Sequence, residues 1–369
     1  MENMLHLSSS SHESLPENFA VPPEQQLPPP TSAVVSLPVI DMSGSRDEVR
    51  RAILDAGKEL GFFQVVNHGV PEQVMRDMEA VGEEFFQLPA ADKAEFYSED
   101  RGKPSRLFSG TSFDTGGEEY RRECLRLSCT SPMSDSTKDW PNKPRRLRCL
   151  YAQTISSSTT IISIGNRSIV ACIWMKEIVE KYIMLAKGVG MEVLRLLCEG
   201  MGLQLDYFEG DLSGGALILE INHYPSCRKP SMTLGLPPHC DRDLITLLLP
   251  GPVHGLEVAY KGDWVRVKPM PSAFVVNFGL QLEVVTNGML KSIEHRVMTN
   301  TMLARTSIST FIQPTEDCLV GPAEEFLSED NPPHYRTHTY GDFMRIYNIV
   351  NLGSSVNHTT NLRKIQKEM

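Results

Sequence analysis

The chain has 369 residues, of which 41% are hydrophobic and 22% are charged, as in an ordinary soluble globular protein. Its net charge of −10 argues against non-specific binding to nucleic acid or to an anionic membrane surface. The eight cysteines include no Cys-x-x-Cys pair, which argues against a zinc ribbon or a disulfide scaffold and favours reduced thiols. No apolar run reaches the length needed to span a membrane.

The N-terminal part of the chain alternates short strands with helices. Residues 1–32 are rich in Ser, Pro, Glu and Gln, which predicts a flexible, extended arm. Residues 34–42 are β-branched around a proline, which predicts an edge strand. Ser45 and Glu48 form a capping box that begins a helix, and a strand is expected at residues 62–66.

A second helix is expected to begin at Pro71, because proline is favoured in the first helical turn. Its buried face is predicted from apolar residues at helical spacing: Val74, Met78, Val81, Phe85 and Leu88. His68 precedes this helix without a nearby carboxylate, which favours a structural turn histidine over a metal ligand.

Residues 149–176 differ in composition from the rest of the chain, because they contain no acidic residue and are dominated by Ser, Thr and Ile. Residues 156–164 have the composition of an aggregation-prone strand. Without the segment, Leu147 would lie three residues before Ile178 and would extend the apolar stripe of the next helix. We therefore interpret residues 149–176 as an insertion, either a natural surface loop or an intron translated in frame.

From residue 216 onward the pattern becomes that of strands. The expected strands cover residues 216–224, 244–249, 256–260, 264–267, 273–278, 282–285 and 307–312, with one more near His295. Strands this frequent, without intervening helices, indicate a jelly roll or a barrel. Helices are expected again at residues 340–350.

The strongest chemical motif is Pro-Pro-His-Cys-Asp at residues 237–241. His239 and Asp241 are two residues apart, so in an extended strand their side chains point to the same side. An open Fe(II) site needs two imidazoles and one carboxylate on one face. His295 supplies the second imidazole, so His239, Asp241 and His295 are the predicted iron ligands.

Arg305 and Ser307 follow ten residues further on and are suited to holding a carboxylate, since both donate hydrogen bonds to it. Taken singly, a His-x-Asp pair or one downstream histidine indicates only an ordinary surface or core residue. The combination at this spacing favours a functional site over that interpretation.

These motifs, together with Leu-Pro-Val-Ile-Asp at residues 37–41 and Gly-Phe-Phe-Gln-Val-Val-Asn-His-Gly at residues 61–69, resemble the plant soluble 2-oxoglutarate- and Fe(II)-dependent dioxygenases. The resemblance covers nearly the whole chain outside residues 149–176. It implies iron on the three ligands named above. It also implies that 2-oxoglutarate is held by the Arg-x-Ser motif together with Asn222 and Tyr224. The implied cofactors are Fe(II), 2-oxoglutarate as cosubstrate, O2, and ascorbate.

The fold implied is mainly β with flanking helices, built on a double-stranded β-helix, or jelly-roll, core with an N-terminal α/β region. The arm at residues 1–32 would be followed by the α/β region at residues 33–200, which carries the insertion. The dioxygenase core would then occupy residues 201–315, and a C-terminal helical region and tail residues 316–369.

Within the family, the resemblance is strongest to the mugineic-acid-forming enzymes of grasses, on residues 106–118, 209–215, 239–246 and 283–288. It implies hydroxylation of a small amino acid with several carboxylates, 2′-deoxymugineic acid, to mugineic acid, with release of succinate and CO2. The alternatives are 3-hydroxylation of mugineic acid and hydroxylation of an alkaloid or a flavonoid-type metabolite.

One departure from the family pattern concerns the substrate pocket, where Arg121 replaces the family's tryptophan. A charge at an expected aromatic wall disfavours an apolar aromatic substrate. Together with Arg106 and Arg122, this residue is expected near the pocket mouth, where guanidinium groups could pair with substrate carboxylates. The alternative is that these three arginines are simply solvated.

Two other classes of protein stay open: a metal-binding protein of the same fold without turnover, and an inactive product of aberrant splicing. The presence of Arg305, Ser307 and Tyr224 argues against the first, because a mere metal binder needs no cosubstrate clamp. The N-terminus lacks the basic start and apolar run of a secretory signal. We expect a cytoplasmic monomer that binds a small-molecule substrate, with neither nucleic acid nor a membrane as partner.

Overall fold

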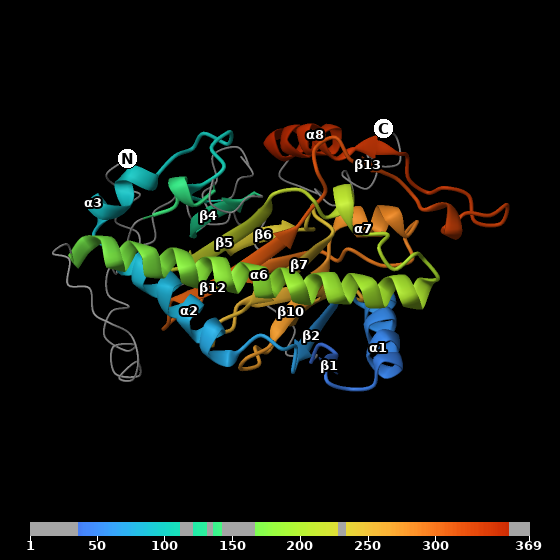
Figure 1. The fold of residues 1–369 in the computed structure, drawn as a ribbon, viewed down its shortest axis with the longest axis horizontal. Coiled ribbons are helices and arrows are strands. Elements are labelled where there is room, and N and C mark those ends of the chain that lie inside the picture. Colours follow the sequence, from blue (N-terminus) through green and yellow to red (C-terminus); the bar gives the residue numbers. More distant parts are fainter. Residues whose placement is uncertain (1–35, 111–120, 131–135, 142–166, 228–233, 354–369) are drawn as a thin grey trace, which may run out of the picture.

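The computed structural model describes residues 36–110, 121–130, 136–141, 167–227 and 234–353. The expected N-terminal arm and the strand-like stretch of the expected insertion lie outside the described residues. Within the described part, the strands form two main sheets, and a long helix crosses one face of the larger sheet (Figure 1).

The larger sheet has eight strands and the smaller one four. In spatial order the large sheet contains β1 (Val39–Asp41), β2 (Phe62–Val66), β10 (Phe274–Phe278), β7 (Ile245–Leu249), β12 (Arg305–Ile312), β5 (Leu217–Tyr224), β4 (Glu123–Cys129) and β3 (Arg106–Ser109). The small sheet contains β6 (Leu234–His239), β11 (His295–Met298), β8 (Leu256–Tyr260) and β9 (Asp263–Arg266). A separate ribbon pairs β13 (Leu319–Val320) with β14 (His338–Thr339).

The strands from β5 to β12 pass back and forth between the two main sheets. β5, β7, β10 and β12 lie in the large sheet, whereas β6, β8, β9 and β11 lie in the small one. This alternation is the connectivity of a jelly roll. Residues of both sheets line one pocket, so the sheets face each other across it. The expected mainly β fold with a jelly-roll core is confirmed.

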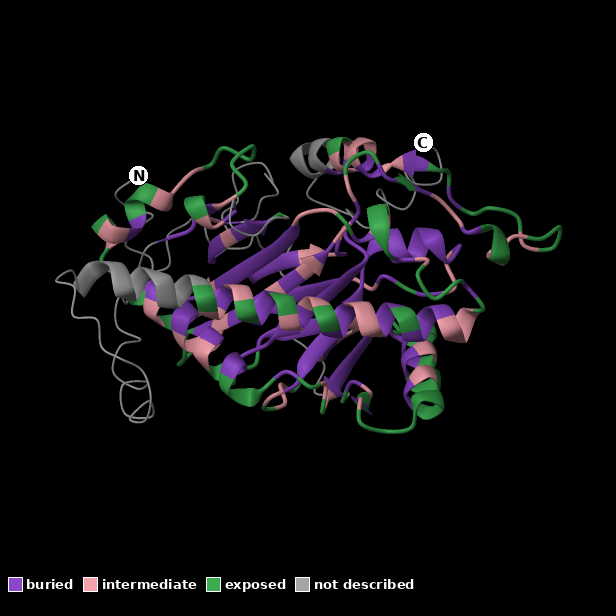
Figure 2. Cartoon of the chain, in the orientation of Figure 1, coloured by how far each residue is buried: buried purple, intermediate pink, exposed green. Residues whose placement is uncertain are grey.

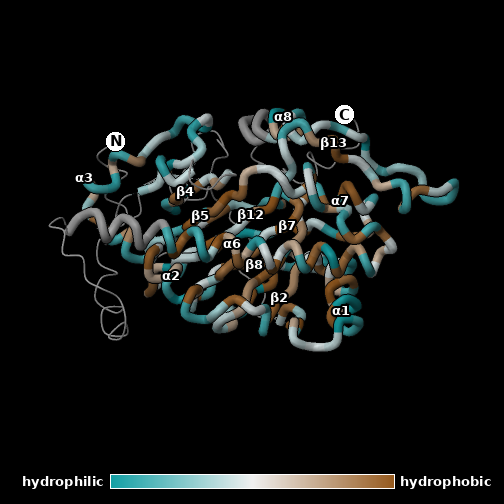
Figure 3. Tube along the Cα trace, viewed as in Figure 1, coloured by the Kyte–Doolittle hydropathy of each residue, from teal (hydrophilic) through white to brown (hydrophobic). Residues whose placement is uncertain are grey.

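The helices flank this core. They are α1 (Arg46–Glu59), α2 (Glu72–Gln87), α3 (Ala90–Lys93), α6 (Arg167–Met201), α7 (Leu280–Val285) and α8 (Tyr340–Gly353). α6 contacts α1, α2, β7 and β12, so it covers the outer face of the large sheet. Figure 2 shows exposed residues on the outer side of α6 and buried strands behind it. Figure 3 shows hydrophobic stretches running through those strands and hydrophilic residues over the outer turns.

The start and end of α1 follow the predicted signals. Ser45 is the N-cap: its hydroxyl donates to Glu48 Oε2 at 2.6 Å and accepts from the Glu48 N–H at 3.4 Å. Gly61 follows the C-cap with φ of +60°, and a side chain there would collide with the Lys291 carbonyl. The chain can therefore turn directly from α1 into β2, which is a neighbour of the core strand β10.

Residues 282–285 are helical, so the expectation of a strand there was wrong. They belong to α7, in which every residue is buried. A short apolar run buried on all sides has no period that separates a helix from a strand. The Leu280 N–H donates to the Asp241 carbonyl at 2.8 Å, so α7 holds the loop that carries one expected iron ligand.

α6 begins at Arg167, inside the segment expected to be an insertion. Among the described side chains of α6, the fully buried ones begin at Val179 and continue through Tyr182 and Ile183. The described core contacts of this helix thus come from Val179 onward, and the side chains of residues 149–176 lie outside the described ones.

We therefore predict that a chain lacking residues 149–176 folds and gives a higher soluble yield than the full chain. The reason is that the buried stripe of α6 is retained and an aggregation-prone stretch is removed. Thermal melting by circular dichroism, together with the soluble fraction after expression, measures both effects. A control lacking residues 179–189, which removes buried side chains, should not fold. A deletion of residues 149–176 that unfolds the protein would show that the segment is part of the core.

Candidate active site

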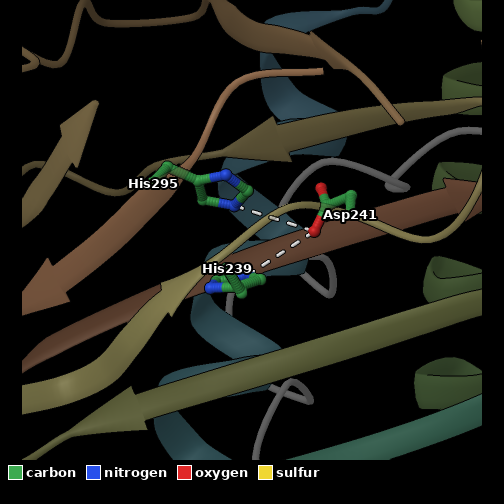
Figure 4. A group of neighbouring side chains, drawn as sticks. All are labelled: His239, Asp241 and His295. Atoms are coloured by element: carbon green, nitrogen blue, oxygen red, sulfur yellow. Dashed lines mark ion pairs between the residues drawn. The ribbon is translucent and has the colours of Figure 1, made fainter. Parts of the chain in front are cut away.

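The three expected iron ligands meet at the edge of the small sheet. His239 is the last residue of β6, and His295 is the first residue of β11 and lies directly opposite it in the ladder. The two imidazole rings are 4.2 Å apart between centroids. Asp241 lies just beyond the end of β6, and its Oδ1 is 3.6 Å from Nε2 of each histidine (Figure 4).

The hydrogen bonds of the two histidines use Nδ1 and leave Nε2 of each ring facing Asp241. Nδ1 of His239 lies 2.8 Å from the Pro237 carbonyl, and Nδ1 of His295 lies 3.2 Å from the Ile293 carbonyl. Because a carbonyl only accepts, each Nδ1 carries the proton and each Nε2 presents a lone pair toward Asp241. This is the tautomer that binds a metal through Nε2.

The carboxylate of Asp241 is oriented in the same way. Its Oδ2 accepts hydrogen bonds from the Thr246 hydroxyl at 2.6 Å and from the Asn277 amide at 2.7 Å, which leaves Oδ1 facing the imidazoles. Oδ2 of Asp243 lies 3.0 Å from the same hydroxyl. Burial and the neighbouring Asp241 charge raise the pKa of Asp243 well above its usual range, which favours the neutral form of its carboxyl group beside Asp241.

The protonation states suit metal binding at neutral pH. Burial would raise the pKa of Asp241, but His295, His239 and the Thr246 hydrogen bond outweigh it and hold the pKa below its usual range. Burial, reinforced by His239, lowers the pKa of His295 to about 4. Asp241 is therefore ionised and His295 is neutral, as metal ligands must be.

The donor set fits Fe(II). One ligand atom from each of His239, Asp241 and His295 lies within 4.8 Å of the others, and no other such group of three occurs among the described residues. Two imidazoles and one carboxylate on one side leave further coordination positions open, as in non-haem Fe(II) oxygenases. His68, His223 and His254 lie elsewhere: they face Ser272, Thr306 and Asn300, respectively.

A second group of polar side chains lies on the strand pair β5–β12. The antiparallel register places Arg305 opposite Tyr224 and Ser307 opposite Asn222, so the four side chains share one face. Arg305 is 3% exposed; its Nε donates to the Val253 carbonyl at 3.1 Å, and its guanidinium carbon lies 5.2 Å from the centre of the Tyr224 ring. Its Nη1 has no hydrogen-bond partner among the described residues, so a buried donor is left for an anion.

Both groups line one pocket between the two sheets, called the central pocket below. His239, Asp241 and His295 lie in its wall together with Arg305 and Ser307. A carboxylate held by Arg305 and a metal held by the histidines would thus occupy the same space. This arrangement can bind a keto acid at a metal through one end and at a guanidinium through the other.

The arginines expected at the pocket mouth are placed differently. Of the three, only Arg122 lines the central pocket, where it donates to Asn222 Oδ1 at 3.0 Å. Arg106 instead donates to the Ser98 carbonyl at 3.0 Å. Arg121 is buried outside the pocket lining, so the charge expected at the pocket wall comes from its neighbour Arg122.

Several lining residues were not anticipated from the sequence. They are Glu220, Arg242, Thr246, Asn277 and Tyr347. One signal was present for Glu220, which is two residues before Asn222 and so lies on the same face of a strand. Thr246, Asn277 and Tyr347 reach the pocket from other elements, and their spacing in the sequence gives no sign of it.

Comparison with known proteins identifies the family of the chain. Residues 216–314 match the 2OG-Fe(II) oxygenase superfamily, and residues 37–146 match the non-haem dioxygenase N-terminal region described for morphine synthesis. The chain therefore belongs to the 2OG-Fe(II) oxygenase superfamily and is an Fe(II)- and 2-oxoglutarate-dependent dioxygenase, which uses Fe(II), 2-oxoglutarate and O2.

Among individual proteins, the chain is 62% identical to 2′-deoxymugineic-acid 2′-dioxygenase of Hordeum vulgare, with 100% of both chains covered. It is 52% identical to mugineic-acid 3-dioxygenase of the same species, covering 100% of this chain and 99% of the relative. It is 34% identical to hyoscyamine 6-dioxygenase of Hyoscyamus niger, covering 92% and 94%.

Among solved structures, JOX2 in complex with 2OG, Fe and JA superimposes with a TM-score of 0.79 at 28% identity, covering 96% of this chain and 95% of that one. This neighbour supports the fold, a jelly-roll core with flanking helices, over nearly the whole chain. Of the helices that the structure describes, none is long and apolar enough to cross a membrane.

Proposed function

We propose that this dioxygenase hydroxylates 2′-deoxymugineic acid to mugineic acid in phytosiderophore biosynthesis, converting 2-oxoglutarate to succinate and CO2. The observation that carries the proposal is the 62% identity, over the full length, to 2′-deoxymugineic-acid 2′-dioxygenase. Identity to mugineic-acid 3-dioxygenase is 52%, so 3-hydroxylation of mugineic acid is the second candidate. Relatives whose names give a flavanone or hyoscyamine as substrate are only 34% identical.

We further propose that His239, Asp241 and His295 hold the iron, which when bound supplies the oxygen-activating chemistry. The support is the set of three facing ligand atoms whose other hydrogen bonds are already satisfied within the protein. Thr246 and Asn277 keep Asp241 ionised and oriented. The protein thereby fixes ligand geometry without occupying the open positions.

We propose that Arg305, Ser307, Tyr224 and Asn222 hold 2-oxoglutarate. The partnerless Nη1 of Arg305 and the shared face of the four residues support this role. Arg305 would bind the far carboxylate in a two-point fork, so that the keto-acid end reaches the metal ligands. Phe62 and Leu256 supply an apolar part of the lining, which helps to exclude water from the reacting C–H bond.

The wall of the central pocket contains charged side chains, which an apolar substrate could not pair with. Arg122, Glu220 and Arg242 all line it. Buried charges of this kind are stabilised by charged partners, so the pocket suits a substrate with carboxylates better than an alkaloid or a flavonoid. This favours the amino-acid candidates over the aromatic ones.

We predict that purified, iron-loaded protein couples succinate release to the addition of one oxygen atom to 2′-deoxymugineic acid. The test is mass spectrometry after incubation with 2-oxoglutarate, oxygen and one of four candidates: 2′-deoxymugineic acid, mugineic acid, hyoscyamine or a flavanone. Reactions without 2-oxoglutarate are the control and should give no product. Coupled turnover of mugineic acid alone would select the second candidate, and turnover of only an apolar aromatic compound would overturn the proposal.

Finally, we propose that the enzyme acts as a monomer in the cytoplasm, without a nucleic-acid or membrane partner. The net charge of −10 supports the absence of anionic partners. All six described cysteines are free and buried, which suits a reducing compartment.

A further inference from the structure

Two paired strands, β5 and β12, form part of the wall of the central pocket, with a cationic residue at one end and an anionic residue at the other. Arg305 lies opposite Tyr224, Ser307 opposite Asn222, and Ser309 opposite Glu220. All six side chains line the pocket, and each step of two residues advances by about 7 Å. The end near Arg305 is the proposed 2-oxoglutarate end. The end near Glu220 and Ser309 is therefore left for the second substrate.

Arg242 lines the pocket and follows Asp241 directly in the chain. Its side chain is half-buried and makes no hydrogen bond or ion pair with any described residue. Its guanidinium carbon lies 6.0 Å from the centre of the Tyr347 ring, a cation–π contact that leaves the N–H donors unused. A cation in this position is stabilised when an anion enters the pocket.

The charges around Arg242 do not balance. Glu220 accepts from Arg126 at 3.2 Å and lies 3.9 Å from Arg122, so its carboxylate is already shared by two guanidinium groups. Arg242 also acts on Glu220 electrostatically. Asp241 also acts on Glu220, but its Oδ1 is turned toward the two histidines of the proposed iron site. Among the described residues, Glu220 thus interacts with three arginines, and their positive charge favours a further anion at this end of the pocket.

We propose that Arg242 binds a carboxylate of the substrate and thereby sets the enzyme's preference for a polycarboxylated amino acid. This inference rests on the proposed function and assigns one residue to substrate recognition. Arg305 is unsuited to the role because it lies at the opposite end of the strand pair. Arg122 is unsuited because it already donates to Asn222 at 3.0 Å and to the Gly110 carbonyl at 3.3 Å. Among the described residues, Arg242 has no hydrogen-bond or ion-pair partner for its side-chain donors.

The first test compares Arg242→Gln and Arg242→Lys with the original enzyme, using iron-loaded protein with 2-oxoglutarate and no oxygen. Calorimetric titration with 2′-deoxymugineic acid should show a dissociation constant raised about 10- to 100-fold in Arg242→Gln, because a charge-assisted hydrogen bond is lost. Arg242→Lys should recover part of the affinity. In both variants the dissociation constants of iron and of 2-oxoglutarate should change by no more than about 2-fold. If Arg242 only supported the structure of the pocket, these two constants would change as well.

The matched control is Arg195→Gln, since Arg195 is an exposed arginine paired with Glu209 at 2.7 Å on the surface. Its substrate affinity should not change. Under oxygen, Arg242→Gln should also release more succinate per hydroxylated product, because a loosely held substrate is hydroxylated in fewer turnovers.

The second test leaves the protein unchanged and so does not depend on the variants folding. Each substrate carboxylate is converted in turn to the carboxamide, and affinity for the original enzyme is measured. One carboxamide should bind at least about 10-fold more weakly than the substrate, and Arg242→Gln should lose this discrimination.

The outcomes separate the two proposals. If the original enzyme binds and hydroxylates 2′-deoxymugineic acid but Arg242→Gln binds it equally well, or no carboxamide is discriminated, the Arg242 inference is overturned and the proposed function stands. If the original enzyme neither binds nor hydroxylates 2′-deoxymugineic acid, the proposed function fails and this inference fails with it.

Discussion

An Asp241→Ala enzyme is expected to lose tight iron binding, and hydroxylation with it. Oδ1 of Asp241 lies 3.6 Å from Nε2 of both histidines and is the only anionic donor of the group. Loss of a residue that merely supports a metal ligand costs about 10- to 100-fold in affinity at other sites, so removal of the ligand itself should cost more than about 100-fold. Iron per chain after gel filtration, with succinate release under saturating 2-oxoglutarate, measures the effect.

The control for this experiment is His254→Ala. His254 is exposed and its Nδ1 lies 3.2 Å from the Asn300 side chain, away from the three ligands. Its loss should leave the iron stoichiometry unchanged. Full iron occupancy and activity in Asp241→Ala would show that the assignment of the iron ligands is wrong.

An Arg305→Lys enzyme is expected to need at least about 10-fold more 2-oxoglutarate for half-maximal rate, and Arg305→Gln about 100-fold more, with iron binding little changed. An ammonium cannot reproduce the planar two-point fork, and glutamine has no charge at all. The buried Nη1 of Arg305, which has no partner among the described residues, is the atom whose hydrogen bond would be lost. The measurement is succinate formation against 2-oxoglutarate concentration at fixed iron.

Arg195→Lys serves as the control, because this exposed arginine pairs with Glu209 on the surface. Its 2-oxoglutarate dependence should match that of the original enzyme. An unchanged 2-oxoglutarate requirement in Arg305→Gln would remove Arg305 from the cosubstrate site. Reduced iron occupancy in the same variant would instead indicate that Arg305 supports the metal end of the pocket.

Local patterns in the sequence were sufficient to predict the flanking elements and to name three residues that the structure brings together, His239, Asp241 and His295. Ser45 and Glu48 marked the start of α1 because a capping box is satisfied within a few residues. β5 and β12 were foreseen because β-branched residues and a proline or charged boundary delimit them. His239 and Asp241 were foreseen as a pair because residues two apart in a strand point to the same side.

The structure places Asp241 beside the two histidines for a different reason from the one predicted. β6 ends at His239, so Asp241 is not part of the strand that was expected to align it. The carboxylate is aimed instead by Thr246 and Asn277, and its backbone carbonyl is held by α7. These partners come from separate elements, and no spacing rule connects them to Asp241.

The sequence by itself thus determined the class of fold and of enzyme, and it named the residues proposed here as metal ligands and as the Arg-x-Ser clamp, because these features are written in short motifs. Only the tertiary structure decided that residues 282–285 are helical, that Arg122 rather than Arg121 lines the pocket, and that Arg242 also lines it. Periodicity states which face of an element is buried. What lies opposite that face depends on how strands distant in the sequence pair, and this pairing is set by the packing of the whole core.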